Sequence, residues 1–185
     1  VVTQAFKEFD TKLSTDEKTF IIDTDLCNAI RNNLHRMDII SRERITSELE
    51  KMFGYYKCKI GLQYMDKLGL YDVIMKNKGQ KQDKRQKMFD VMDMIYNINP
   101  FHSELRWTVF LYSCFGDFCL AGKEFKLSNE RVDFMERTHM AALLFLSSSD
   151  TMFEIKKGII EAGKYTPEAY TLARAWANVN YQEKP

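Results

Sequence analysis

Proline and glycine are scarce in this sequence, with three prolines and eight glycines among 185 residues. Turns between short strands use these two residue types heavily, so their scarcity argues against a β-sandwich or a small barrel. Hydrophobic residues make up 45% and charged residues 29% of the chain, a balance typical of globular domains with a buried core. The composition therefore predicts a helical globular protein.

Metal-binding and disulfide patterns are also lacking. The four cysteines include no C-x-x-C pair, and His35, His102 and His139 show no ligand spacing with one another or with the cysteines. We expect reduced thiols, an intracellular location (mitochondrial or cytoplasmic) and no metal site. His139 lies on an apolar helical stripe, which is typical of a hydrogen-bonded core histidine.

Long hydrophobic runs and an excess of one charge are missing as well. No run of about 18 apolar residues occurs, and no signal or transit peptide is visible, so no membrane partner is expected. The formal net charge is +1, from 27 basic and 26 acidic residues. Any nucleic-acid binding must therefore come from local basic patches.

Helical periodicity dominates what is present, and predicts an elongated all-α assembly of about eight or nine helices. The clearest helix follows Ser41, a good N-cap, and carries an apolar stripe of Ile45, Leu49, Met52 and Phe53. Gly54 and Gly69 follow apolar stripes at positions where a left-handed closing residue is expected.

Four further helices are predicted from periodicity and start signals. One runs from about residue 24 to residue 36, and one covers 105–120, which is apolar nearly all round and so should be central in a bundle. The helix after residue 150 is expected to turn Met152, Ile155, Ile159 and Ala162 inward. Thr166-Pro167-Glu168 is a strong helix start.

A basic segment at 76–87 marks the main change in composition. It is predicted to be a loop or linker between an N-terminal part, 1–75, and a C-terminal part, 88–185. RNA phosphates could bind its cations, although a charge run is more often simply a solvated loop. The basic residues are Lys76, Lys78, Lys81, Lys84, Arg85 and Lys87, with Asp83 as their one acidic neighbour.

The stretch from Ile40 to Leu70 carries a resemblance to a known family. Ser41-Arg42-Glu43-Arg44-Ile45, then Glu48-Leu49, Lys51 and Leu68-Gly69-Leu70, occur in the order and spacing of the neck of class II tRNA nucleotidyltransferases (CCA-adding enzymes) and bacterial poly(A) polymerases. The resemblance is strong over 20–75 and weak after 100. It implies that 1–75 is neck-like and 88–185 is a body-like helical bundle, without the catalytic head.

The resemblance also implies a role for four residues of the neck helix. In the family this helix braces the residues that recognise the nucleotide base, which points to Arg42, Glu43, Arg44 and Glu48. The alternative is an exposed helix face with an Arg44–Glu48 ion pair, which contributes a few tenths of a kcal/mol.

Catalytic residues are not expected in this chain. The family's head holds two magnesium ions on an Asp-x-Asp strand, and two-metal chemistry needs such clustered carboxylates. Asp23-Thr24-Asp25 fits that pattern, but no Gly-Ser turn or strand precedes it, so we interpret it as a helix cap. The family's nucleotide-selecting E-D-x-x-R motif is absent, and the first thirty residues contain no arginine. Magnesium and CTP or ATP are expected only if a head is encoded before Val1.

Two functions remain open from the sequence. The first is a non-catalytic RNA-binding region that holds the acceptor arm of tRNA, as these helices do in the family. The second is a degenerate, head-less relative that serves with other protein subunits in a ribonucleoprotein complex. Tyr55, Tyr56 and Lys57 could stack on and pair with a nucleotide, or could pack a loop against the bundle.

Overall fold

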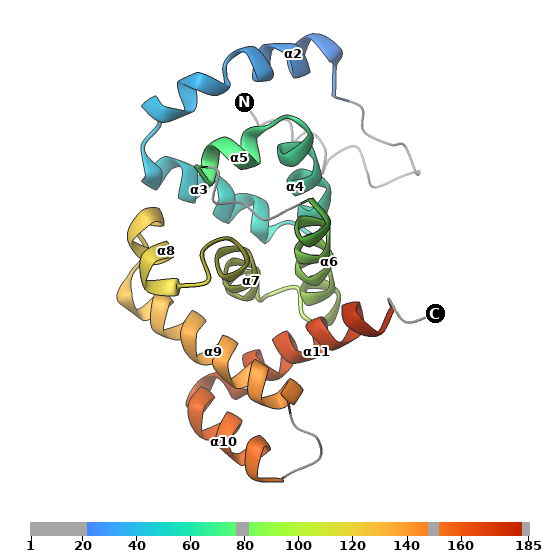
Figure 1. Ribbon diagram of the computed structural model, residues 1–185, viewed down its shortest axis with the longest axis vertical. Coiled ribbons are helices and arrows are strands. Elements are labelled where there is room, and N and C mark those ends of the chain that lie inside the picture. The colour runs from blue at the N-terminus through green and yellow to red at the C-terminus, as the bar shows by residue number, and fades with distance from the viewer. Residues whose placement is uncertain (1–21, 77–81, 148–151, 183–185) are drawn as a thin grey trace.

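The computed structural model describes residues 22–76, 82–147 and 152–182, and these form an all-α protein (Figure 1). Within these ranges there are ten α-helices, two short 3₁₀ helices and no strand, which confirms the predicted fold class. None of these helices is both long and apolar enough to cross a membrane.

The helices follow one another with short connections. The N-terminal ones are α2 (Thr24–Asn32), η1 (Leu34–Ile39), α3 (Arg42–Gly54), α4 (Cys58–Lys67) and α5 (Leu70–Ile74). The middle ones are α6 (Gln82–Ile98), α7 (Ser103–Phe115) and α8 (Phe118–Phe125). The last are α9 (Asn129–Ser147), α10 (Met152–Ala162), η2 (Gly163–Tyr165) and α11 (Thr166–Gln182).

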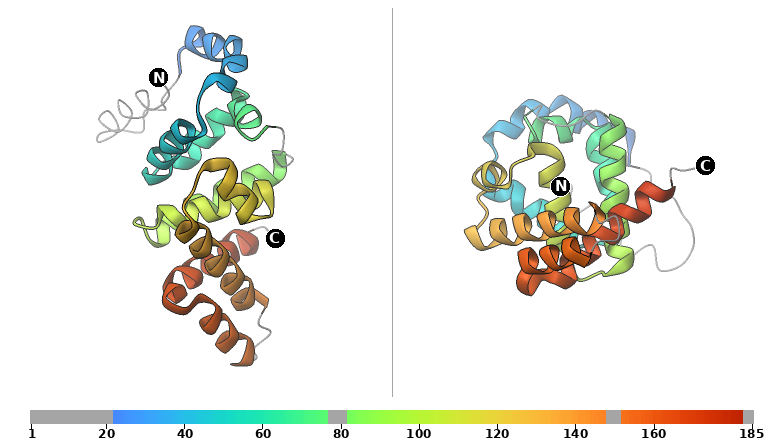
Figure 2. Two further views of the ribbon diagram at one scale, coloured as in Figure 1. Left: turned by 90° about the vertical axis from the view of Figure 1, so that its left-hand side faces the viewer. Right: turned by 60° about the horizontal axis from the view of Figure 1, so that its bottom comes forward.

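The molecule is elongated, with α2 at one end and the α9–α10 hairpin at the other (Figures 1 and 2). Helices α3, α4 and α5 form a layer next to α2, followed by α6, α7 and α8. Helix α11 packs against both α6 and α9 and so joins the α9–α10 hairpin to the rest.

Helix α7 is the centre of the core. Every residue from Leu105 to Leu111 is buried, which confirms the central position predicted for this apolar segment. Trp107 and Phe110 pack edge-to-face with Phe53 of α3, at centroid distances of 4.8 and 5.1 Å. The same cluster of buried residues continues from α3 to α11. The neck-like and body-like segments therefore share one core.

Three helix boundaries differ from the sequence prediction. Gly116 has a φ of +65° and ends α7, so the segment predicted as one helix over 105–120 is two helices, α7 and α8. The helix predicted over 24–36 ends at Asn32 and continues as the 3₁₀ helix η1. Gly54 is the last residue of α3 and has no positive φ, whereas Gly69 has φ +79° as expected.

Helix α10 leaves large side chains exposed that the sequence predicted to be buried. Of the four residues expected to face inward only Ala162 is buried, and Met152, Ile155 and Ile159 are exposed. Helix α10 instead meets α9 through its small residues, because the ring of Phe145 lies against Gly158. A Cβ atom at position 158 would come within 2.5 Å of that ring, so the close approach of the two helices depends on glycine.

Candidate nucleic-acid interface

The first turns of α2 and α3 are fixed by side-chain caps. The Asp23 carboxylate accepts hydrogen bonds from the backbone N–H groups of Asp25 and Leu26 at 2.7 and 3.3 Å, which confirms that it caps a helix. The Ser41 hydroxyl likewise accepts from the Arg44 N–H at 3.4 Å. The sequence resemblance that starts at Ser41 thus coincides with the start of a real helix.

Arg42 braces α3 against two neighbouring helices. Its Nη1 donates to the carbonyl oxygen of Ile74 at 2.7 Å, at the end of α5, and its Nη2 lies 2.8 Å from the Glu124 carboxylate of α8. One turn further on, the buried hydroxyl of Thr46 donates to the Phe125 carbonyl at 2.8 Å. Arg42 therefore has a packing role within this chain.

The other end of α3 is held by Arg106, a residue that the sequence analysis did not select. Arg106 lies in α7 and is 1% exposed. Its guanidinium donates to the carbonyls of Phe53 and Tyr55, where α3 ends, and to the Met92 carbonyl of α6. Burial lowers the pKa of Arg106, while helix-terminal carbonyls favour a cation at this position. The only sequence feature that could have pointed to a buried Arg106 is its position as a single charged residue between Leu105 and Trp107.

A third arginine links α3 to the body-like part. Arg131 of α9 forms ion pairs with Glu50 of α3 and Glu104 of α7. Its guanidinium also lies 5.6 Å from the centre of the Trp107 ring. Together, Arg42, Arg106 and Arg131 attach α3 to α5, α6, α7, α8 and α9.

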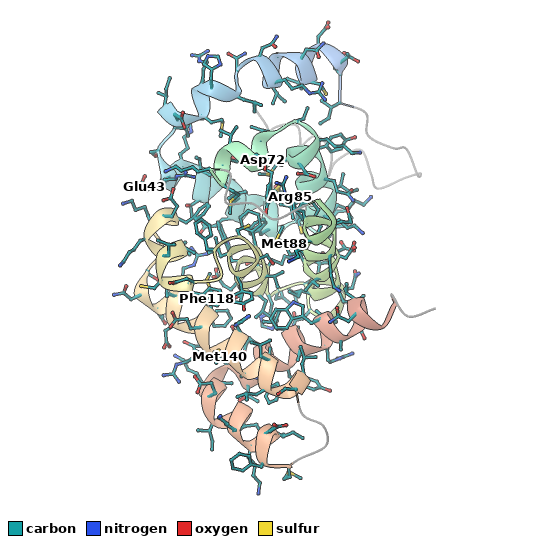
Figure 3. All side chains as sticks on the ribbon, in the orientation of Figure 1. Glu43, Asp72, Arg85, Met88, Phe118 and Met140 are labelled. Carbon is teal, nitrogen blue, oxygen red and sulfur yellow. The ribbon has the colours of Figure 1, made fainter. Side chains whose placement is uncertain are left out.

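Arg85 was predicted to belong to an RNA-binding cluster, and the structure places it in an ion-pair network. Its two Nη atoms pair with Asp66 of α4 and Asp72 of α5. Figure 3 labels Arg85 and Asp72. The guanidinium lies 4.4 Å from the centre of the Tyr71 ring, and the side chain is 13% exposed. Arg85 therefore joins α6 to α4 and α5.

The rest of that basic cluster is divided between loop and helix. Because α6 begins at Gln82, Lys84, Arg85 and Lys87 lie on a helix, contrary to the loop predicted over 76–87. Lys76 lies 2.9 Å from Glu124, and Lys84 is exposed. Lys78 and Lys81 lie outside the described residues. RNA binding by this cluster stays a prediction, as does the division of the chain at 76–87.

The remaining residues of the neck motif face solvent. Glu43 and Arg44 are exposed, and Figure 3 shows Glu43 at the outer edge of α3, well away from Arg85. Glu48 pairs with Lys51 at 2.9 Å, in place of the Arg44–Glu48 pair considered from the sequence. Arg44 is therefore available to a partner.

Two arginines that precede Arg44 in the chain are also exposed to solvent. Arg31 at the end of α2 and Arg36 in η1 are exposed. In the part of the chain that the structure describes, no carboxylate lies within ion-pair distance of Arg31, Arg36 or Arg44, although the exposed Asp25, Asp38 and Glu43 lie on the same helices. These three residues, hereafter the arginine row, follow the chain from α2 through η1 into the first turn of α3. Sequence analysis selected only Arg44.

The loop between α3 and α4 packs against the bundle. The rings of Tyr56 and Tyr96 lie 6.3 Å apart, and the carbonyl of Tyr55 accepts from Arg106 at 2.7 Å. Lys57 lies over the Tyr56 ring at 5.3 Å. This arrangement favours the packing interpretation of Tyr55, Tyr56 and Lys57 over nucleotide stacking.

His139 is a core residue, as predicted, but its contacts are aromatic. It is 3% exposed and lies 3.7 Å from the ring centre of Tyr112, with Phe118 and Trp176 also around it. Its Nε2 has no hydrogen-bond partner among the described residues, contrary to the prediction. Burial lowers its pKa to about 4. No group of three metal-ligating side chains occurs in the described ranges.

Comparison with known proteins finds a family match for one part of this chain. Residues 19–78 match the family model described as a probable RNA- and SrmB-binding site of polymerase A. No curated protein and no solved structure gives a significant match.

The matched segment contains α2, η1, α3, α4 and α5, and hence the whole arginine row. Residues 19–78 thus resemble the RNA-binding region of poly(A) polymerases, in line with the resemblance found over 20–75. RNA is the partner that this match supports.

Proposed function

We propose that this chain is a non-catalytic, RNA-holding helical module that binds the acceptor arm of tRNA through the arginine row. The observation that carries this proposal is the coincidence of two features in one segment. The family match covers 19–78, and the same segment exposes Arg31, Arg36 and Arg44 without local carboxylate partners. Exposed cations that have no ion-pair partner within the protein are what phosphate backbones bind.

The packing of α3 makes the surface around Arg44 suitable for binding RNA phosphates. Arg42 and Arg106 fix both ends of α3, so Arg44 projects from a helix whose position is fixed by the core. A cation held on a rigid element loses less conformational entropy on binding than one on a loop. Contacts to the sugar-phosphate backbone fix register without reading sequence, which suits a module that holds the arm of many tRNAs.

A direct test is the affinity of the full chain for a fluorescently labelled tRNA, measured by anisotropy. The variant Arg36→Glu/Arg44→Glu is expected to weaken binding at least tenfold. The matched control is Lys164→Glu/Arg174→Glu, which changes the net charge equally but on the exposed surface of η2 and α11. Equal losses in both variants would show that only net charge matters, and would contradict a site on the arginine row.

The second candidate is a structural subunit of a ribonucleoprotein complex. It is favoured by Arg42 of the neck motif, whose contacts with Ile74 and Glu124 serve packing within this chain. Competition separates the two candidates. A tRNA-holding module releases labelled tRNA to unlabelled tRNA more readily than to an unrelated RNA hairpin of equal length. A subunit that recognises another RNA shows no preference for tRNA.

A further inference from the structure

The outer surface of α10 is the most apolar exposed region in the described part of the chain. Five large side chains on this helix are exposed, two of them on more than 70% of their surface: Phe153 (75%) and Ile160 (79%). This α10 apolar face consists of Met152, Phe153, Ile155, Ile159 and Ile160. Figure 1 shows that α10 lies at the end of the molecule opposite α2.

Helix α10 differs from an ordinary surface helix in which of its residues are buried. Its buried residues are Gly158 and Ala162, which face α9. Phe153 and Ile160 are the most exposed of its large apolar residues, and Ile155 and Ile159 lie partly exposed beside the contact. A surface helix of a monomer normally turns its large apolar residues inward and its polar residues to water. The arrangement of α10 is expected when a second surface covers the outer side.

The exposed area is appropriate for a stable contact. With about 200 Å² for each large apolar side chain, the fractions exposed on α10 amount to on the order of 600 Å². That is at the upper end of the largest apolar patch on a typical monomer. It approaches the roughly 800 Å² that each partner buries in a standard protein interface. Met140 of α9, labelled in Figure 3, is also exposed.

The charges on α10 favour a second copy of this chain over a lipid surface. Glu154, Lys157 and Glu161 recur at helical spacing and so lie along one flank of α10. No ion pair involves their side chains within the described ranges. Because this flank carries both signs, an antiparallel α10 of another copy can set Lys157 against a glutamate. The two lysines and two glutamates of α10 cancel, so the helix lacks the net positive charge typical of anionic-membrane binding.

We propose that the chain forms a twofold-symmetric dimer through the α10 apolar face, with the two α10 helices antiparallel. In a twofold interface the same patch is contributed by both copies, so self-complementarity of shape and charge is required. The charges of Glu154, Lys157 and Glu161 along one flank meet the charge part of that requirement. Lys156 is also exposed and lies between Met152 and Ile160 on the apolar face. The dimer leaves both arginine rows exposed, because they lie at the far ends of the two copies.

Sedimentation velocity of the full chain over a concentration series tests this proposal. We expect a species of twice the chain mass in the native protein and a monomer in Phe153→Glu/Ile160→Glu. The control Phe101→Glu changes a residue that is 89% exposed in the α6–α7 connection, and it should stay dimeric. Circular dichroism confirms that each variant is folded, since all three positions are exposed and should tolerate the change.

Cross-linking gives a second, independent measurement. In a Cys119→Ser background, which removes an exposed thiol, Ile160→Cys should form a covalent dimer on mild oxidation, and Phe101→Cys should not. A native chain that is monomeric up to about 100 µM, well above the range of stable interfaces of this size, contradicts the proposal. Co-sedimentation of that monomer with anionic vesicles would assign the α10 apolar face to lipid instead.

Discussion

The Arg106 guanidinium of α7 donates a hydrogen bond of 2.7 Å to the carbonyl oxygen of Tyr55, directly after the end of α3. It thereby satisfies helix-terminal carbonyls in the middle of the core, and no carboxylate lies within ion-pair distance of it among the described residues. The helix that carries the family resemblance is thus anchored by a residue from outside the matched segment. This relationship makes the RNA-binding region depend on the rest of the chain for its stability.

Arg106→Met should therefore be among the most damaging single substitutions. It leaves the carbonyls of Phe53, Tyr55 and Met92 without their donor, and should lower the free energy of unfolding by about 3 to 5 kcal/mol. Urea denaturation followed by circular dichroism measures this change. The control is Arg174→Met on the exposed side of α11, which should stay within about 0.5 kcal/mol of the native protein. A loss as small as the control's would show that the Arg106 contacts contribute little.

Arg42 and Arg44 should separate stability from RNA binding. Arg42→Ala removes the hydrogen bond to Ile74 and the partly buried pair with Glu124, so we expect a loss of about 1 to 2 kcal/mol of unfolding free energy. Arg44→Ala should leave stability within about 0.5 kcal/mol and weaken RNA binding. The opposite pattern, with Arg44→Ala the less stable of the two, would overturn the roles given to these neighbours.

The contact between Gly158 and Phe145 should be sensitive to a single methyl group. Gly158→Ala places a Cβ within 2.5 Å of the Phe145 ring, and overpacking of this kind costs about 1 to 3 kcal/mol. Phe145→Leu in the same chain should recover part of that loss, because it makes room for the methyl group. A double-mutant cycle from urea unfolding measures the coupling, and additive effects would disprove the clash.

His139 should make stability fall in mild acid. Its pKa is about 4 in the folded protein and about 6.5 when unfolded, so the unfolded chain binds the proton first. The stability from neutral His139 is fully present above pH 6.5 and is lost as the pH falls toward 4, to a maximum of about 3 kcal/mol. The difference in unfolding free energy between the native protein and His139→Gln, measured from pH 7.5 to 4, should shrink accordingly. A constant difference would show that His139 titrates normally.

The sequence predicted best the features that depend on local patterns. Ser41 and Asp23 cap the helices that follow them, and Ile45, Leu49, Met52 and Phe53 are all buried, because capping and helical spacing are decided within a few residues. The break at Gly116 escaped prediction because the apolar run continues on both sides of it. The exposure of Met152, Ile155 and Ile159 on α10 also escaped prediction, because periodicity identifies an apolar face but not what covers it.

The candidate site was harder to predict than the fold. Charge density along the chain selected Arg85, whose guanidinium is held by Asp66 and Asp72 from two other helices. Such pairing is decided in three dimensions and leaves no sign in the local sequence. Conversely, Arg31 and Arg36 are isolated in the sequence and became notable only when the structure showed them exposed without carboxylate partners.

The measurement that tests the RNA-binding proposal most directly is the salt dependence of tRNA binding by the full chain. Each phosphate contact adds roughly 0.7 to 0.9 to the slope of log affinity against log salt concentration. Native protein should show a steep slope, and Arg31→Gln/Arg36→Gln/Arg44→Gln should show a slope smaller by about 2 to 3. Identical slopes for the two proteins would contradict phosphate binding by the arginine row.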